Sequence, residues 1–467
     1  MKDPEPQDWV KVKAYAARIR AIRLDPYSYP SYYAVLKLAG SMYLTLKRCL
    51  GAEPLLPNLR SFEWTQVQQN EPEDVASLLL MLNPKVSSMD VVLGKMGIES
   101  AIEIADALSS FGENPAQLRT IHIVSPPCPP IEAAVLALGF RQQHLREFRY
   151  TWENEMSLDT VTHLSSMNNL QEVSIRANRD TSRQLLEWAK DRSGHFFPSL
   201  QLFSLYTDTL SVCEAWLDTI RHPGLSSLAF TVNQAPTATA LREFFLKLVA
   251  HPAHGNLSKL RFSSTTPCSR NDTHLHVLRS DMIASLLQLN LQVLKLEPGG
   301  PIEIDDDFVV RMARAWPRLR VLELNPEWRR YTVPTVTLAG LIPLAQHCPD
   351  VNAFAIPIST DVSAFEEEYE AGHRPTGGFS FRQCYMVGVG SSPVDQEADH
   401  LMIAGFLSDL CPDLMALQTS WARAGPPKED ERGLDVENQE MGDSWRQIEK
   451  YAREMARGRR QERMWME

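Results

Sequence analysis

The amino-acid sequence predicts an α/β solenoid in which short parallel strands alternate with helices along nearly the whole chain. A triad of apolar residues, spaced three and then two positions apart, recurs fourteen times at intervals of about 30 residues. The segments between the triads have helical periodicity. Prolines stand two residues before the triad at Pro57, Pro84, Pro198, Pro317, Pro349 and Pro412 and would stop the preceding helix there. We therefore expect an irregular horseshoe of about 14 repeats, with strands on the concave face and helices on the convex face.

Each triad is expected to be a strand with its approach. In the copy that begins at Leu319, Leu322 and Leu324 fall on one face by the two-residue period of a strand, and Leu319 joins them from the preceding turn. Val321 and Glu323 then point to the opposite, concave face. The copies begin at Ile19, Leu59, Val86, Leu118, Leu145, Leu170, Leu200, Leu225, Leu257, Leu291, Leu319, Val351, Phe381 and Leu414.

The connecting segments are expected to be amphipathic helices. The clearest cover residues 181–190, 239–249 and 306–316, where apolar residues recur at three- and four-residue steps. The Thr or Asp that begins each is expected to be its N-cap, because its side-chain oxygen can accept from an unpaired amide.

The ends of the chain differ from the repeats. We predict an N-terminal capping helix in residues 1–18 and one solenoid over residues 19–422. Residues 423–443 are acidic and rich in turn formers, which indicates a flexible linker. Residues 444–467 are expected to form a basic amphipathic helix that docks on the last repeat, and a membrane-surface helix or peptide motif stays open as the alternative.

Composition narrows the classes of function. The net charge is −11 and the pI is about 5.6, which argues against general nucleic-acid binding. The seven cysteines are scattered, without a Cys-x-x-Cys pair, so a reducing compartment, cytoplasmic or nuclear, fits best. The chain has no secretory hydrophobic segment at its start and no run of 18 apolar residues, so we expect no membrane span.

Local motifs for catalysis or metal binding are weak. The run Asp305–Asp307 could suggest a cation site, but its place at a predicted helix start favours capping. His274 and His276 alternate on an extended stretch without a third ligand at suitable spacing. Gly388 and Gly390 precede Ser-Ser-Pro and indicate a turn rather than a phosphate loop. We predict no enzyme, no cofactor and no metal site, and a dispersed catalytic site stays open as a third alternative.

The concave face is then the candidate binding surface, because long concave sheets are the surfaces that solenoids generally use for partners. Its polar residues could equally be a solvated face. Our hypothesis is that an acidic segment of a protein partner docks there. The residues proposed to contact the partner are Arg149, Arg176, Tyr206, Lys259, Arg261, Lys295, Glu297 and Glu323.

The order and phase of several motifs resemble the leucine-rich-repeat region of fungal F-box proteins over about residues 8–422. The motifs lie at residues 16–24, 56–62, 316–324, 338–349, 389–393 and 404–414. The resemblance implies the substrate-binding part of a Skp–cullin–F-box ubiquitin ligase receptor, in which a separate F-box grips the Skp adaptor.

The chain departs from that family at its start, because only 18 residues precede the first triad and none resembles an F-box. A Skp-type adaptor is therefore expected as a partner only if an F-box lies upstream. The first interpretation is a non-enzymatic interaction solenoid that lacks or has lost its F-box. The alternative is a stand-alone leucine-rich-repeat protein that sequesters or inhibits a protein partner without a ligase.

Overall fold

The computed structural model describes residues 6–24, 45–46, 48, 50, 53–65, 72–113, 118–126, 128–151, 156–190, 196–326, 328, 333–365, 373–394, 400–421 and 435–466. The chain divides into two compact units, Met1–Tyr206 and Thr207–Glu467. The extent of the solenoid over residues 19–422 stays a prediction from the sequence. Each unit is a stack of strand–helix repeats.

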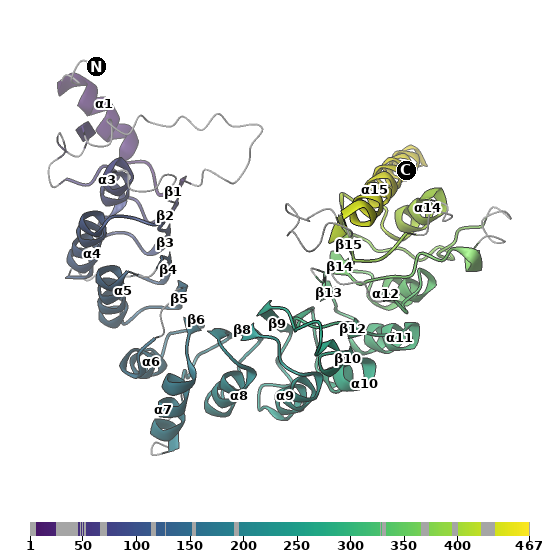
Figure 1. The fold of residues 1–467 in the computed structure, drawn as a ribbon. Helices are drawn as coiled ribbons and strands as arrows, with labels where there is room; N and C mark the ends of the chain where they lie inside the picture. Colours follow the sequence, from purple (N-terminus) through teal and green to yellow (C-terminus); the bar gives the residue numbers. More distant parts are fainter. Residues whose placement is uncertain are drawn as a thin grey trace. The chain divides into compact units, whose positions relative to one another are not determined.

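The first unit is built on a parallel sheet whose strands pair in chain order. The strands are β1 (Ala21–Leu24), β2 (Ser61–Thr65), β3 (Ser88–Val92), β4 (Thr120–Val124), β5 (Glu147–Thr151), β6 (Glu172–Arg176) and β7 (Leu202–Thr207). The helices that connect them cover one face of the sheet (Figure 1). They are α3 (Pro72–Met81), α4 (Ile98–Glu113), α5 (Pro129–Arg141), α6 (Leu158–Ser165) and α7 (Arg179–Lys190), and α1 (Pro6–Ala16) precedes β1.

The second unit repeats this arrangement with a parallel sheet of its own strands. They are β8 (Ser227–Gln234), β9 (Lys259–Thr266), β11 (Val293–Glu297), β13 (Val321–Leu324), β14 (Ala353–Ala355), β15 (Met386–Gly390) and β16 (Ala416–Thr419). A short parallel pair that the sequence does not predict, β10 (Leu278–Arg279) with β12 (Ile302–Glu303), stands apart.

Helices again cover one face of the second sheet (Figure 1). They are α8 (Leu210–Thr219), α9 (Ala238–Ala250), α10 (Ser280–Ile283), α11 (Asp306–Ala315), α12 (Ile342–His347) and α14 (His400–Leu410), and α15 (Asp435–Met466) follows at the end of the unit. The described residues of this unit also include short 3₁₀-helices: η1 (Thr273–Leu275), η2 (Ala284–Gln288), η3 (Ala339–Leu341) and η4 (Ser363–Phe365).

The apolar triads form the core of both units, which confirms the predicted parallel α/β solenoid. Leu319 and Leu322 are fully buried and Leu324 nearly so. In thirteen of the fourteen copies the strand begins two residues after the first apolar residue of the triad. Burial of these side chains between strand and helix is the main favourable term in folding a stack of this kind, at about 25 cal/mol per Å² of apolar surface.

The prediction is wrong in register for the thirteenth copy of the triad. The prediction starts it at Phe381, whereas β15 begins at Met386, which pairs with Ala353 of β14. The triad in phase with the sheet is therefore Cys384, Val387 and Val389, all of which are fully buried. Two overlapping triads share the same spacing here, and spacing alone could not choose between them.

The predicted helices form, but their N-caps lie one to three residues earlier than expected. Asp305 Oδ1 accepts from the Phe308 amide at 2.9 Å. Thr237 caps α9 by accepting from the Ala240 amide, and Asn178 caps α7 by accepting from the Thr181 amide. Asp306, released from capping, instead accepts from the amide and the hydroxyl of Thr337, both at 2.8 Å, and so joins two consecutive repeats.

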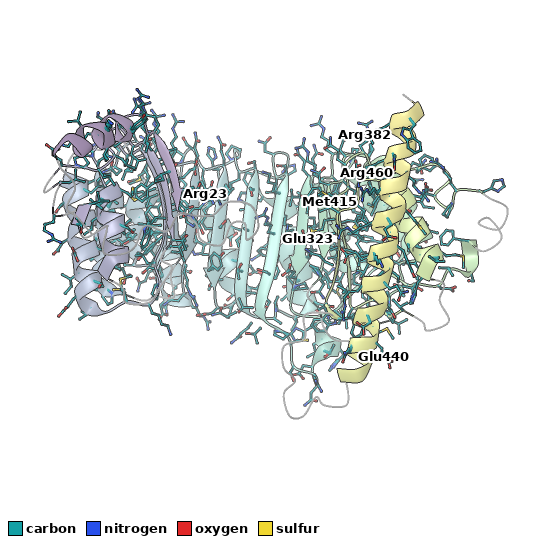
Figure 2. The ribbon with its side chains drawn as sticks, turned by 90° about the horizontal axis from the view of Figure 1, so that it is seen from above. Arg23, Glu323, Arg382, Met415, Glu440 and Arg460 are labelled. Carbon is teal, nitrogen blue, oxygen red and sulfur yellow. The ribbon has the colours of Figure 1, made fainter. Side chains whose placement is uncertain are left out.

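The C-terminal helix α15 begins at Asp435, nine residues before the predicted start, so part of the predicted linker is helical. Residues 423–434 lie outside the described residues. Figure 2 shows α15 running across the end of the second unit from Glu440 to Arg460. Trp445 and Ile448 are fully buried, and the Glu449 carboxylate accepts from the Leu417 amide of β16 at 3.3 Å. The predicted docking is confirmed, and the helix covers the exposed edge of the last strand.

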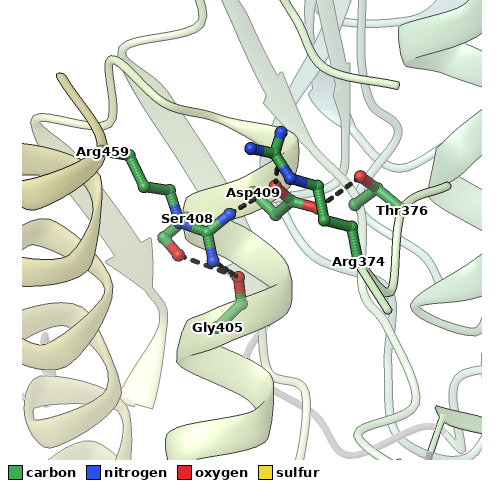
Figure 3. A network of polar contacts seen from close by, with 6 residues as sticks. All are labelled: Arg374, Thr376, Gly405, Ser408, Asp409 and Arg459. Carbon is green, nitrogen blue, oxygen red and sulfur yellow. Dashed lines mark hydrogen bonds and ion pairs between the residues drawn. The ribbon is translucent and has the colours of Figure 1, made fainter. Parts of the chain in front are cut away.

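A buried carboxylate pins α15 to α14 (Figure 3). Asp409 of α14 is 3% exposed and accepts from Thr376 Oγ1 at 2.6 Å and from Arg459 Nη1 of α15. Arg459 also donates to the Gly405 carbonyl at 3.4 Å, and Arg374 lies 3.8 Å from Asp409. A buried carboxylate with several donors stays satisfied, which makes the position of this helix specific.

Candidate protein-binding surface

The face of each sheet that the helices leave uncovered is called the open face here. Side chains on a strand alternate between the two faces, so every second residue of each strand points to the open face. Parallel pairing in register then places equivalent residues of neighbouring strands side by side in rows. The charges of these rows decide what each open face can bind.

On the first unit, the row begins with two carboxylates that are paired within the sheet. Arg23 and Glu63, neighbours on β1 and β2, form an ion pair with Arg23 Nε 2.8 Å from Glu63 Oε2. Asp90 and His122 follow on β3 and β4, and His122 Nδ1–H donates to Asp90 Oδ2 at 2.7 Å. Both carboxylates in this half of the open face are therefore engaged by side chains of the sheet.

Arg149 of β5 continues the row, and its Nε donates to the carboxylate of Glu172 on β6. The hydrogen bond to Glu172 raises the pKa of Arg149, against the lowering effect of partial burial. Arg176 also takes part in an interaction within the chain, and it lies in register with Tyr206, whose side chain is 39% exposed. The predicted contact residues of this unit are thus placed on the open face, with their basic members engaged internally.

On the second unit, two cations on β9 differ from this pattern. Lys259 and Arg261 are exposed, two residues apart, and so lie on the same face. Arg261 stands in register between Ala229 of β8 and Lys295 of β11. Within the part of the chain that the structure describes, neither Lys259 nor Arg261 has a carboxylate within ion-pair distance. We call these two residues the β9 basic site.

The next members of the row are neutralised. Lys295 Nζ lies 2.7 Å from Glu323 Oε1 of β13, and Glu323 is only 8% exposed. Glu323 pairs with Lys295 within the sheet, and its predicted contact with a partner stays a prediction. Glu297 is half-buried and has an interaction within the chain. Ala355 and Gly388, both small, continue the row.

Hydroxyl groups border the β9 basic site. Thr231 of β8 and Ser263 of β9 lie in register, with their side-chain oxygens 3.0 Å apart. Both strands are eight residues long, so the site is on an extended, regular part of the sheet. An ammonium, a guanidinium and neighbouring hydroxyls together make a surface of donors, which suits carboxylates.

The other candidate chemistries of the sequence are accounted for by local contacts. Asp305 caps α11, and Asp306 accepts from Thr337 of the next repeat. His276 Nδ1–H donates to the Pro236 carbonyl at 2.8 Å. Among the described residues, no group of three or more His, Cys, Asp or Glu side chains is arranged to hold a metal ion. No helix in the described ranges is both long enough and apolar enough to cross a membrane.

Comparison with known proteins gives little further identification. No family model matches the chain, and no curated protein matches it in sequence. Among solved structures, a chain in the crystal structure of the Rad7–Elc1 complex from yeast is similar to it. The two chains are 10% identical, with 73% of this chain and 78% of that chain covered and a TM-score of 0.38. The proposals below are therefore argued from the residues and contacts of this chain.

Proposed function

We propose that this protein is a non-enzymatic interaction solenoid whose β9 basic site binds an acidic segment of a protein partner. The observation that carries the proposal is a contrast in pairing. The other basic side chains described on the open faces interact within the chain, as in the pairs Arg149–Glu172 and Lys295–Glu323. Lys259 and Arg261 are exposed without such a neighbour among the described residues. Carboxylates from a partner would supply the missing charge.

The physical role of this site is orientation and selectivity more than affinity. A solvent-exposed ion pair contributes about 0.2–1 kcal/mol, so two cations alone cannot hold a partner. The hydroxyls of Thr231 and Ser263 and the backbone of the adjacent strands would add directed contacts. On a protein with a net charge of −11, a local basic site also selects which part of an acidic partner approaches first.

Reversal of both charges tests the proposal. The tagged protein and a variant with Lys259→Glu and Arg261→Glu are purified from cells, and the proteins that accompany each are quantified by mass spectrometry. We expect the variant to lose, by about tenfold or more, a partner that contains an Asp- and Glu-rich segment.

The matched control is Arg242→Glu with Arg314→Glu, which changes net charge equally at exposed positions on α9 and α11. This control should keep the partner. If both variants retain the same partners as the unaltered protein, the β9 basic site has no role in binding.

A finer proposal is that the solenoid is the substrate-binding part of a Skp–cullin–F-box ubiquitin ligase receptor inside the cell. Its support is the resemblance in sequence to the repeat region of fungal F-box proteins. Co-purification of a Skp adaptor, with this chain and with the chain extended by upstream coding sequence, tests it. If neither form binds the adaptor while the acidic partner is retained, the protein acts instead by sequestering or inhibiting that partner.

A further inference from the structure

A second basic surface lies in the first unit, along the edge of the sheet where the chain enters the strands. The residue just before each strand stands on this edge, and backbone hydrogen bonds fix the neighbours. The amide of Arg60 donates to the Arg20 carbonyl, Ser87 to Arg60, Arg119 to Ser87, and Arg146 to Arg119, each at 2.8 Å. Four arginines therefore occupy five consecutive rungs, and we call these four residues the arginine edge.

The guanidinium groups of the arginine edge are turned to solvent. All four arginines are exposed. Arg20 Nη1 donates to the Ala17 carbonyl at 2.9 Å, and within the described residues Arg60, Arg119 and Arg146 form no side-chain hydrogen bond or ion pair. Glu147 follows Arg146 directly but is half-buried on the open face. Among the described residues, the arginine edge is thus a run of like charges that has no carboxylate at the distance of an ion pair.

The fold itself does not require arginine at these positions. Equivalent positions further along the first unit hold Gln171 and Gln201, and those of the second unit begin with Ser226, Ser258 and Gln292. Neutral polar side chains therefore serve this edge equally well. Like charges on adjacent strands destabilise a sheet slightly, so a concentration of arginines between β1 and β5 is unfavourable for folding alone and points to a ligand.

We propose that the arginine edge binds an extended, Asp- and Glu-rich polypeptide segment of a protein partner. Neighbouring strands lie about 4.8 Å apart, so the four spacings between the five rungs from Arg20 to Arg146 span about 19 Å. An extended chain advances about 3.3 Å per residue, so about six residues of a partner cover this length. Each planar guanidinium can hold one carboxylate through two parallel hydrogen bonds.

The surroundings favour a polypeptide over a nucleic acid. The whole chain has a net charge of −11. This net charge repels a long polyphosphate backbone, whereas a short acidic peptide needs to match only the four guanidinium groups of the arginine edge. The arginine edge lies in the first unit and does not include the β9 basic site, so each of the two proposals can be tested independently of the other.

Binding of a fluorescein-labelled peptide of about ten glutamates to the full chain, followed by fluorescence anisotropy at low ionic strength, tests the proposal. We expect Arg60→Glu with Arg119→Glu to raise the Kd by about tenfold or more. Because both side chains are exposed, circular dichroism and thermal unfolding should be unchanged. Arg320→Glu, at the same position before β13 of the second unit, and the pair Arg242→Glu and Arg314→Glu should leave the Kd unchanged.

Three results would overturn the proposal. The first is an equal Kd for the unaltered chain and the Arg60→Glu, Arg119→Glu variant. The second is loss of peptide binding in the Lys259→Glu, Arg261→Glu variant alone, which would assign the peptide to the β9 basic site. The third is a single-stranded oligonucleotide or a serine-phosphorylated peptide that binds more tightly than the glutamate peptide and is lost with Arg60 and Arg119, since the ligand would then be a phosphate.

Discussion

His251, just after α9, is buried in its neutral form. Its Nε2–H donates to the Ile220 carbonyl at 2.6 Å, and its Nδ1 accepts from the Ala253 amide at 3.1 Å. A second proton would remove the acceptor and place a charge in the core. Burial accordingly lowers the pKa of His251 below its ordinary value, and the hydrogen bond to Ile220 opposes this only in part.

The lowered pKa makes stability depend on pH with a definite sign. The unfolded chain binds a proton at His251 below about pH 6.5, whereas the folded protein resists it, so the free energy of unfolding should fall as the pH falls from 7.5 to 5.5. Urea unfolding at both pH values measures this, and His251→Gln should have a shallower dependence. An equal dependence in that variant would contradict the buried neutral imidazole.

At the scale of single elements, α15 is held by one face. Trp445, Ile448, Ala452 and Ala456 are fully buried, and Trp445 Nε1 donates to the Ser392 carbonyl at 2.9 Å. Because these contacts lie far in sequence from the strands that α15 covers, this helix depends on tertiary packing more than on its own propensity.

Truncation of that face should release the helix. We expect Trp445→Ala to destabilise the protein by about 3–5 kcal/mol and to increase hydrogen exchange in α15 and at the Leu417 amide that Glu449 covers. Trp465→Ala is the matched control, because the Trp465 side chain is 74% exposed, and a change within about 0.5 kcal/mol is expected there. Comparable exchange in both variants would contradict the docking of α15 through Trp445.

The sequence predicts strands well because their signal is local. The spacing of a triad such as Leu319, Leu322 and Leu324 predicts which of its side chains are buried, and therefore where the strand lies. The failures are also local: two triads overlap at Cys384, and several polar residues compete to cap the same helix. The β10–β12 pair has only two residues per strand, too few to show a period.

At the scale of the whole molecule, the charge of a surface depends on neighbours that the sequence separates. Side chains two residues apart on a strand point to the same face, so the sequence of β9 alone is enough to place Lys259 and Arg261 on the open face. The pairing of Arg149 with Glu172 joins residues 23 apart, and that of Lys295 with Glu323 joins residues 28 apart. Repeat lengths vary, so these pairs could be identified only once the register was known.

The arginine edge was missed for a different reason. Its residues stand in turns just before the strands, where the apolar period gives no information. The available signal was the residue that follows the first apolar position of each triad, which is Arg in four of the first five copies. Solenoid repeats align such positions automatically, so a turn residue becomes part of a continuous surface.

The central claim, that the open face of the second unit carries the partner, is tested most directly by the reactivity of its lysines. The protein, alone and with the acidic partner recovered by purification, is acetylated briefly, and modification of each lysine is measured by mass spectrometry. Our account predicts that the partner protects Lys259, while Lys450, exposed on α15, and Lys95 stay as reactive as before. Unchanged reactivity of Lys259 in the saturated complex would contradict it.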